Sequence, residues 1–150
     1  MRISAKSDYA VRAAVELAAG NGMVKGEAIA QAQDIPLRFL ENILSDLRHA
    51  GIVRSQRGAD GGYALAVPAA EVTVADVIRA VDGPLASVRG ERPEHVSYLG
   101  AAEPLTQVWI AVRANLRAVV EHVTLADLAA GRLPAAVGAL ADDPDAWVTR

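Results

Sequence analysis

Apolar residues recur every three to four positions through most of the chain, and this spacing predicts amphipathic helices. Residues 7–22 predict a first helix that is capped by Ser7 and ended by Gly20 or Gly22. Its expected buried stripe comprises Val11, Ala14, Val15 and Ala18. Similar spacing returns in later segments, so we expect a mainly α-helical protein.

Residues 26–51 predict two helices that are separated by a sharp turn near Asp34 and Ile35. Pro36 suits the first turn of the second helix, where an N–H group would have no intrahelical partner. Positions i, i+3, i+4 and i+7 of this helix form one apolar face: Leu40, Ile43, Leu44 and Leu47. We expect Gly51 to end the helix. If the apolar face points inward, the outward face presents Arg38, Glu41, Asn42 and Ser45.

Residues 52–65 read IVRSQRGADGGYAL, and two short runs of β-forming residues flank three glycines. The pattern predicts a β-hairpin. Gly58, Gly61 and Gly62 could cradle a phosphate, but such loops lead into a helix, whereas this loop leads into a strand. A hairpin tip that enters the minor groove of DNA benefits from little bulk and from an arginine. We therefore interpret Arg57 as a candidate minor-groove contact.

The segments after the hairpin predict two short helices and one long helix. The first short helix is capped by Thr73 with Asp76, and the second occupies residues 124–131. The long helix runs from Pro104 to about His122. Its apolar stripe and the adjoining indole comprise Leu105, Val108, Trp109, Val112, Leu116, Val119 and Val123. We expect core or dimer packing for these residues, with an effector pocket as the alternative for the indole.

This order of elements predicts a winged helix-turn-helix followed by a long helix. Residues 1–83 would form the DNA-binding region, and residues 84–103 an irregular connection. The long helix and the short helix after it would occupy 104–133, and 134–150 would be a mobile tail.

The composition fits one domain with a hydrophobic core, because the chain has 150 residues, of which 52% are hydrophobic. No apolar run approaches the roughly 20 residues that are needed to span a bilayer. Arg12 and Glu16 interrupt the apolar part of the N-terminal segment, which is not typical of a signal peptide. The chain has no cysteine. These features lead us to expect a cytoplasmic protein without disulfides.

The net charge of −3 is unevenly distributed along the chain. Residues 1–67 hold eight Lys and Arg against seven Asp and Glu, a balance of +1. Residues 68–150 hold seven against eleven, a balance of −4. A contact surface on the first part would therefore not repel phosphate.

Four blocks of sequence carry a resemblance to a known family: MRISAKSDYAVRA, FLENILSDLRHAGIVRSQRGADGGYAL, VTVADVIRAVDG and VTLADLA. In this order, over about residues 1–130, they resemble the Rrf2 family of bacterial winged-helix regulators. The resemblance implies a homodimer on a palindromic operator, in which the long helix is the dimerisation helix and crosses its twin. It implies that bases are read by Leu37, Phe39, Glu41 and Asn42 and that Arg57 enters the minor groove. It also implies phosphate contacts from Arg2, Ser4, Lys6 and Tyr9.

The sequence departs from the family pattern in two places. The turn between the two helices often carries glycine in the family, and this chain has Asp34, which tolerates a left-handed conformation. Cluster-binding members place three cysteines within the segment that corresponds to 84–107, often with a further ligand, and here Gln107 stands near the position of that ligand. We therefore expect no iron–sulfur cluster and no other cofactor.

Other site chemistry has weaker support in the sequence. Glu91, Glu94 and His95 lie close enough together to hold zinc, although solvated surface loops often share this composition. His49 and His122 lie on polar helix faces and are expected to be solvated. No nucleophile with a neighbouring base is evident, so we expect no enzymatic activity.

The sequence therefore predicts a dimeric regulator, most simply a repressor, that binds double-stranded DNA. A small-molecule effector or a partner enzyme would control it. The connection would be either a pocket for an apolar or mixed effector or a rigid brace on the long helix. The alternative is a protein-interaction module that binds a partner metabolic enzyme and binds DNA weakly.

Overall fold

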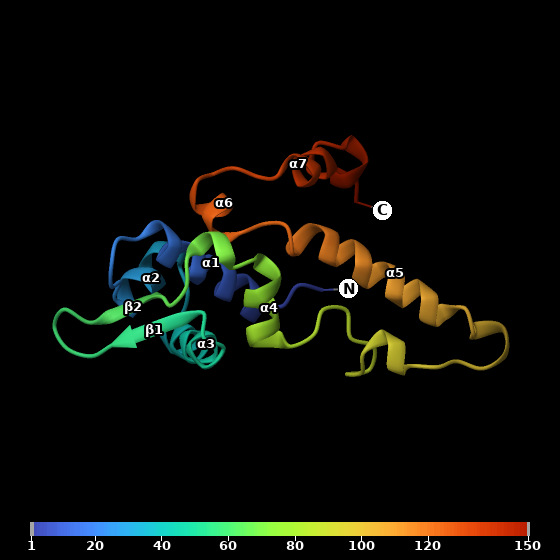
Figure 1. The fold of residues 1–150 in the computed structure, drawn as a ribbon, viewed down its shortest axis with the longest axis horizontal. Coiled ribbons are helices and arrows are strands. Elements are labelled where there is room, and N and C mark those ends of the chain that lie inside the picture. Colours follow the sequence, from blue (N-terminus) through green and yellow to red (C-terminus); the bar gives the residue numbers. More distant parts are fainter. Residues whose placement is uncertain (1, 150) are drawn as a thin grey trace.

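A computed structural model describes residues 2–149 of the chain as a helical head from which one long helix extends (Figure 1). The elements in chain order are α1 (Ala5–Ala19), α2 (Gly26–Gln33), α3 (Leu37–His49), β1 (Val53–Gln56), β2 (Gly62–Leu65), α4 (Val74–Asp82), α5 (Leu105–Val120), α6 (Leu125–Ala129) and α7 (Ala135–Ala141). The mainly helical winged helix-turn-helix fold that the sequence predicts is confirmed.

Helix α1 begins earlier than expected. Ser4 is its N-cap, because the Ser4 hydroxyl accepts a hydrogen bond of 2.9 Å from the backbone N–H of Ser7. The predicted cap at Ser7 is wrong. Its side chain is buried and donates a 2.6 Å hydrogen bond to the Asp82 carboxylate at the end of α4. The helix ends at Gly20, as expected.

The buried side of α1 is rotated from the predicted one. Ala14 is buried as expected, but the other buried apolar residues are Ala10, Ala13 and Leu17. The expected Val11, Val15 and Ala18 are only partly buried and pack on the flank of the core. Alanines on the inner side allow α3, α4 and α6 to approach the backbone of α1 closely, because they add almost no side-chain volume.

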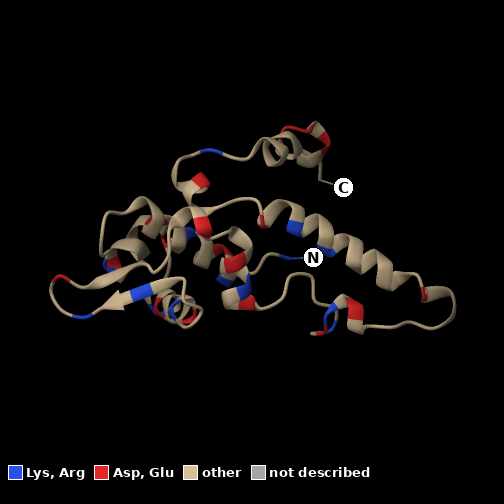
Figure 2. Cartoon of the chain, viewed as in Figure 1, with Lys and Arg blue, Asp and Glu red and all other residues tan. Residues whose placement is uncertain are grey.

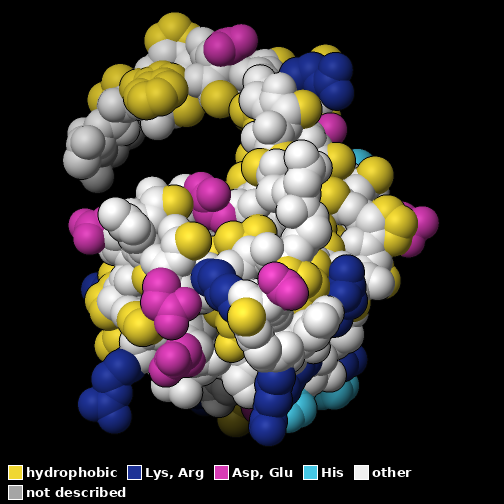
Figure 3. All heavy atoms as spheres, turned by 90° about the vertical axis from the view of Figure 1, so that its left-hand side faces the viewer, with side chains coloured by type: hydrophobic (Ala, Val, Ile, Leu, Met, Phe, Trp, Pro, Cys, Tyr) yellow, Lys and Arg dark blue, Asp and Glu magenta, His cyan; other side chains and the backbone are white. Residues whose placement is uncertain are grey.

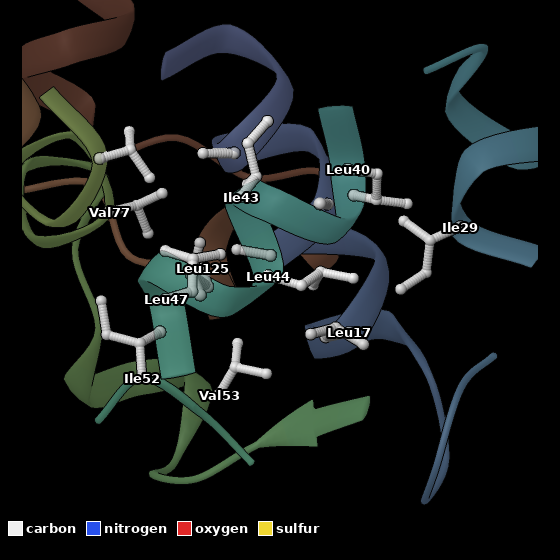
Figure 4. Packing of buried hydrophobic residues seen from close by; sticks show 14 of the residues in the cluster. Leu17, Ile29, Leu40, Ile43, Leu44, Leu47, Ile52, Val53, Val77 and Leu125 are labelled. Carbon is white, nitrogen blue, oxygen red and sulfur yellow. The ribbon is translucent and has the colours of Figure 1, made fainter. Parts of the chain in front are cut away.

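Helix α3 places its apolar face at the centre of the core (Figure 4). The four predicted residues Leu40, Ile43, Leu44 and Leu47 are at most 1% exposed. They pack with residues from every neighbouring element: Leu17, Ile29, Val53, Val77 and Leu125. This face of the helix is confirmed, so its opposite side is free for another role.

A β-bridge joins the start of α4 to the start of α6, and each of these helices begins with a capping box. Thr73 with Asp76 begins α4, and Thr124 with Asp127 begins α6. A β-bridge joins the two threonines, so the chain returns from α5 to the head. We call α1–α4, the hairpin and α6 together the head, because they surround one core to which α6 contributes the fully buried Leu125.

The remainder of the chain lies outside this core. Residues 84–104 run out along α5 without regular structure except for two 3-10 turns, Pro93–His95 and Gly100–Ala102 (Figure 1). Helix α7 falls in the segment for which we expected a tail, and none of its residues is buried. Within residues 2–149, no helix combines the length and the apolar character needed to cross a membrane.

Candidate nucleic-acid interface

The turn between α2 and α3 fixes the direction in which α3 leaves the head. Asp34 has φ 51° and ψ 50°, so an aspartate occupies the left-handed position that glycine often fills in this motif. Ile35 after it is 4% exposed, and its N–H donates a 2.9 Å hydrogen bond to the Ala30 carbonyl. The departure at Asp34 therefore leaves the turn intact, as expected.

The outward side of α3 carries the predicted polar residues and two exposed apolar ones. Arg38, Glu41 and Asn42 are exposed, and Ser45 is half-buried. The apolar ones are Leu37, which is 36% exposed, and Phe39, which is 61% exposed. A large aromatic ring so far from the core is more understandable on a contact surface than on a solvated face.

The hairpin beside α3 has a third strand-like segment that the sequence pattern did not reveal. β1 pairs with β2 in antiparallel register, from Val53 opposite Leu65 to Gln56 opposite Gly62. On the other side of β2, Val24 and Tyr63 exchange two backbone hydrogen bonds of 2.8 Å. Val24 is a single bridging residue and forms no repeating pattern, so no sequence signal could have identified it. This bridge attaches the hairpin to the chain just before α2.

Two of the three loop glycines are required by close backbone contacts. A Cβ on Gly61 would lie 2.1 Å from the Gln56 carbonyl oxygen, and one on Gly62 would lie 2.4 Å from the carbonyl oxygen of Val24. Gly62 also has φ +144°. The glycines therefore shape the hairpin tip, residues 57–61. Contacts of Gly58, Gly61 and Gly62 with DNA stay a prediction.

Arg57 lies at the hairpin tip and is exposed. Among the ion pairs within residues 2–149, none involves Arg57. Lys25 braces the same tip, since its ammonium donates a 3.0 Å hydrogen bond to the Gly58 carbonyl. Asp60 adds a negative charge to the tip, so the loop at the left edge of Figure 2 carries both signs. The arginine is free to contact an outside partner.

Basic side chains continue from the hairpin onto the end of α3. Arg48 and His49 lie in the last turn of α3, and Arg54 lies on β1. The Arg48 guanidinium donates a 3.4 Å hydrogen bond to the Ser55 hydroxyl, which joins α3 to the hairpin. Figure 3 shows Lys and Arg side chains with His along the lower edge of the head. The outer side of α3 and the hairpin therefore form one surface with cationic character.

The expected phosphate contacts near the N-terminus already have partners inside the head. Lys6 forms a 2.8 Å ion pair with Asp46 of α3 and donates a 2.9 Å hydrogen bond to the Val81 carbonyl of α4. Ser4 caps α1 and also donates to the carboxylate of Asp82. These side chains join α1, α3 and α4. Their phosphate contacts, and those of the exposed Arg2, stay predictions.

Asp82 and Tyr9 complete this N-terminal cluster. Burial acts to raise the pKa of the Asp82 carboxyl, but hydrogen bonds from Ser4 and Ser7 and the charge of Lys6 hold it below its ordinary value. Tyr9 is half-buried, and the Arg12 guanidinium lies 4.8 Å from its ring centre. The ring is thus shielded on one side by a residue of its own helix.

The predicted dimer residues, which lie on α5 and just after it, fall into two environments. Val108 is 50% exposed, whereas Val123 is buried in the head. The half-buried members face the same chain: Leu105, Trp109, Val112, Leu116 and Val119. The Trp109 indole donates a 3.0 Å hydrogen bond to the Tyr98 hydroxyl of the connection. Most of the predicted stripe therefore packs at least partly within one chain.

Comparison with known proteins identifies the family. Residues 3–131 match the family model of Rrf2, described as an iron-dependent transcriptional regulator. The chain belongs to the Rrf2 family. Rv1287 of Mycobacterium tuberculosis, named as an HTH-type transcriptional regulator, is 52% identical over 145 residues, which are 95% of this chain and 90% of that protein. The HTH-type transcriptional regulator CymR of Bacillus subtilis is 36% identical over 86% of this chain and 90% of its own.

A solved structure supports the same assignment. The global cysteine regulator CymR of B. subtilis superposes with a TM-score of 0.73 at 34% identity, covering 89% of this chain and 99% of that one. The chain is thus a helix-turn-helix transcriptional regulator of the Rrf2 family and not an enzyme.

The iron dependence in the family description does not fit the residues of this Rrf2 protein. Iron–sulfur clusters are held chiefly by cysteine thiolates, and the chain has no cysteine. Glu94 accepts a hydrogen bond from Arg113 instead. Over residues 2–149, no three His, Cys, Asp or Glu side chains are placed to hold a metal ion, and this includes the zinc ligands considered above, Glu91, Glu94 and His95.

Anaerobic incubation of this Rrf2 protein with iron and sulfide should leave no chromophore after desalting. The reason is that carboxylates, imidazoles and the amide of Gln107 cannot replace soft thiolate ligands. Visible absorbance and an iron assay would measure the result. A brown protein with stoichiometric iron would contradict it.

Proposed function

We propose that this Rrf2 regulator is a homodimeric repressor that places two α3 helices and two hairpin tips on a palindromic operator. The observation that carries the proposal is the outer side of α5, which is exposed but uncharged. It comprises Gln107, Val108, Ile110, Ala111, Ala114, Asn115 and Ala118. In Figure 2, α5 is tan along most of its length apart from the bands of its two arginines.

An uncharged helix face suits contact with the same face of a second copy of the chain. Surface helices normally carry charges on the side that faces water. Of the two charged residues of α5, Arg113 is half-buried, and the exposed Arg117 borders the outer side, seven positions after Ile110. Both line a cavity beside this side of the helix. Three alanines on the outer side would let two α5 helices cross at close range around a two-fold axis.

Such a dimer would repress by occupying promoter DNA. Two recognition helices read adjacent major grooves when they are about 34–36 Å apart, one turn of DNA or a multiple of it. On α3, Glu41 could accept from cytosine N4 and Asn42 could pair with adenine. The hairpin tip would bring Arg57 into the flanking minor groove, where the negative potential is strongest.

Arg57→Ala should weaken operator binding by about 1–3 kcal/mol, which is roughly 5- to 150-fold in Kd, without changing the melting temperature. The side chain is exposed and has no ion pair within the described residues, so its loss leaves the fold intact. Operator fragments would be obtained by sequencing DNA that co-purifies with the protein, and fluorescence anisotropy would give Kd.

Arg132→Ala is the matched control, because Arg132 is also an exposed arginine but lies after α6, away from the hairpin. Its Kd should equal that of the native protein at the same salt concentration. Equal affinities of the Arg57 variant and the native protein would show that the hairpin tip does not contact DNA.

A further inference from the structure

A cavity of about 430 Å³ lies between the end of α4, the connection and α5. Its lining includes four arginines: Arg79 from α4, Arg92 from the connection, and Arg113 and Arg117 from α5. Gly83, Pro84 and Leu85 form its wall at the end of α4. The volume falls in the range of about 300–1,000 Å³ that is usual for small-ligand sites.

This concentration of positive charge runs against the composition of the surrounding sequence. Residues 68–150 have seven Lys and Arg against eleven Asp and Glu, yet four of the seven line this one cavity. A helix surface that served only solubility would scatter them. The arrangement is therefore unlike an ordinary solvated surface.

Three carboxylates offset part of this charge. Glu94 pairs with Arg113, Glu121 accepts from both Arg79 and Arg117, and Asp76 lies 3.8 Å from Arg79. The hydrogen bond from Arg79 is the main cause that holds the pKa of Glu121 below its ordinary value, so this carboxylate is charged at neutral pH. Four positive and three negative groups leave a balance of +1.

The arginines keep donors to spare after these pairs are formed. Each guanidinium has five N–H groups in a planar fork. Arg113, whose side chain is only 23% exposed, donates to Glu94 through Nη1. Arg92 forms no ion pair within residues 2–149. These donors converge from three segments that are far apart in the chain.

We propose that this cavity binds a small anion of the phosphate or carboxylate class, and that the anion controls operator binding. Guanidinium forks match both kinds of oxyanion through paired hydrogen bonds. The regulatory part of this inference rests on the proposed function. The ligand chemistry is the part that depends on the cavity alone.

The position of the cavity connects α5 to the recognition helix. Arg79 and Gly83 belong to the end of α4 that also holds α1 and α3. The Val81 carbonyl there accepts from Lys6, which is paired with Asp46 of α3 at 2.8 Å. An anion that bridges α4 and α5 would fix the angle between the head and α5, and hence the spacing of two heads in a dimer.

Thermal unfolding of the full chain without DNA tests the ligand site. Inorganic phosphate and succinate are the probes, each compared with sodium chloride at equal ionic strength. At about ten times Kd, the better probe should raise the melting temperature of the native protein by roughly 3–5 °C. The exposed Arg92→Gln variant and the half-buried Arg113→Gln variant should bind it about 10-fold more weakly or worse.

Arg132→Gln is the matched control, because it removes one exposed arginine outside the cavity. The Arg132→Gln variant should show the same rise in melting temperature as the native protein. The site is refuted if neither probe raises the melting temperature more than chloride does, or if Arg92→Gln keeps the full rise. That variant decides the question even if Arg113→Gln does not fold, since Arg92 is exposed and has no ion pair in the described range.

Operator binding then tests regulation separately. The stabilising probe should change the operator Kd of the native protein at constant ionic strength, and at the same concentration it should change that of Arg92→Gln clearly less. An anion that stabilises the protein without changing this Kd would refute the regulatory role. Failure to bind any operator would instead refute the proposed function, and the result of the unfolding experiment would stand independently.

Discussion

Ala114→Glu should sediment as a monomer of 15.7 kDa, whereas the native protein should sediment at twice this mass. Ala114 lies in the middle of the uncharged outer side of α5 and is exposed in the single chain. Glutamate favours helices, so the substitution should leave the chain folded. In a two-fold dimer, however, two carboxylates would face each other in a desolvated contact, which costs several kcal/mol.

Loss of the dimer should also lower operator affinity by about 100-fold or more, because each head would then bind its half-site alone. Ala32→Glu is the control for sedimentation, since it adds the same charge to an exposed position of α2. If Ala114→Glu still sedimented as a dimer, the contact between two copies would have to lie elsewhere than on α5.

Val112 of the predicted stripe is half-buried within its own chain, whereas Ala114 is exposed. Val112 lines a small cavity of about 210 Å³ together with Trp109 and residues 86–88 of the connection. A charge at Val112 would therefore disturb packing within one chain as well as any dimer. The apolar period along α5 marks a side that is half-buried except at Val108, but it cannot tell whether the same chain or a second copy covers that side.

The features that the sequence predicted correctly are local ones. The four apolar residues of α3 repeat at helical spacing, and Thr73 and Thr124 each stand three residues before an aspartate. Such signals depend on a few neighbouring residues, so they survive almost any tertiary context. The hairpin was also predictable, because its glycines separate two short β-forming runs.

The features that the sequence did not reveal depend on contacts between distant segments. Ser4 and Ser7 are both reasonable caps by composition, and only the approach of Asp82 explains why Ser7 is drawn inward. Val24 joins the hairpin through a partner 39 positions away, Tyr63. The arginine-lined cavity collects residues between positions 79 and 117, none of which is unusual on its own.

Among the candidate DNA contacts, too, the local features were predictable and the contacts between distant segments were not. The outward position of Arg38, Glu41 and Asn42 follows directly from the helical period, and the structure leaves them exposed. Lys6 was expected to contact phosphate, but it has an acidic partner in Asp46. No pattern in the sequence brings these two residues together, because the pairing depends on how α1 crosses α3.

Gly61→Val should weaken operator binding at least as much as loss of the Arg57 side chain, by about 1–3 kcal/mol or more. A Cβ at Gly61 would lie 2.1 Å from the Gln56 carbonyl oxygen and 2.7 Å from the Arg57 carbonyl carbon. Both are backbone atoms, so the loop itself must move. The movement displaces Arg57 together with the rest of the hairpin tip.

The fold should largely survive this change, because the tip adds no residue to the hydrophobic core. Ala59→Val is the control, since Ala59 is exposed on the same loop and gains similar bulk without a backbone clash of this kind. Thermal melting and fluorescence anisotropy on one operator fragment would separate the two effects. Native affinity in Gly61→Val would mean that DNA recognition does not depend on the shape of the tip, and that α3 alone supplies it.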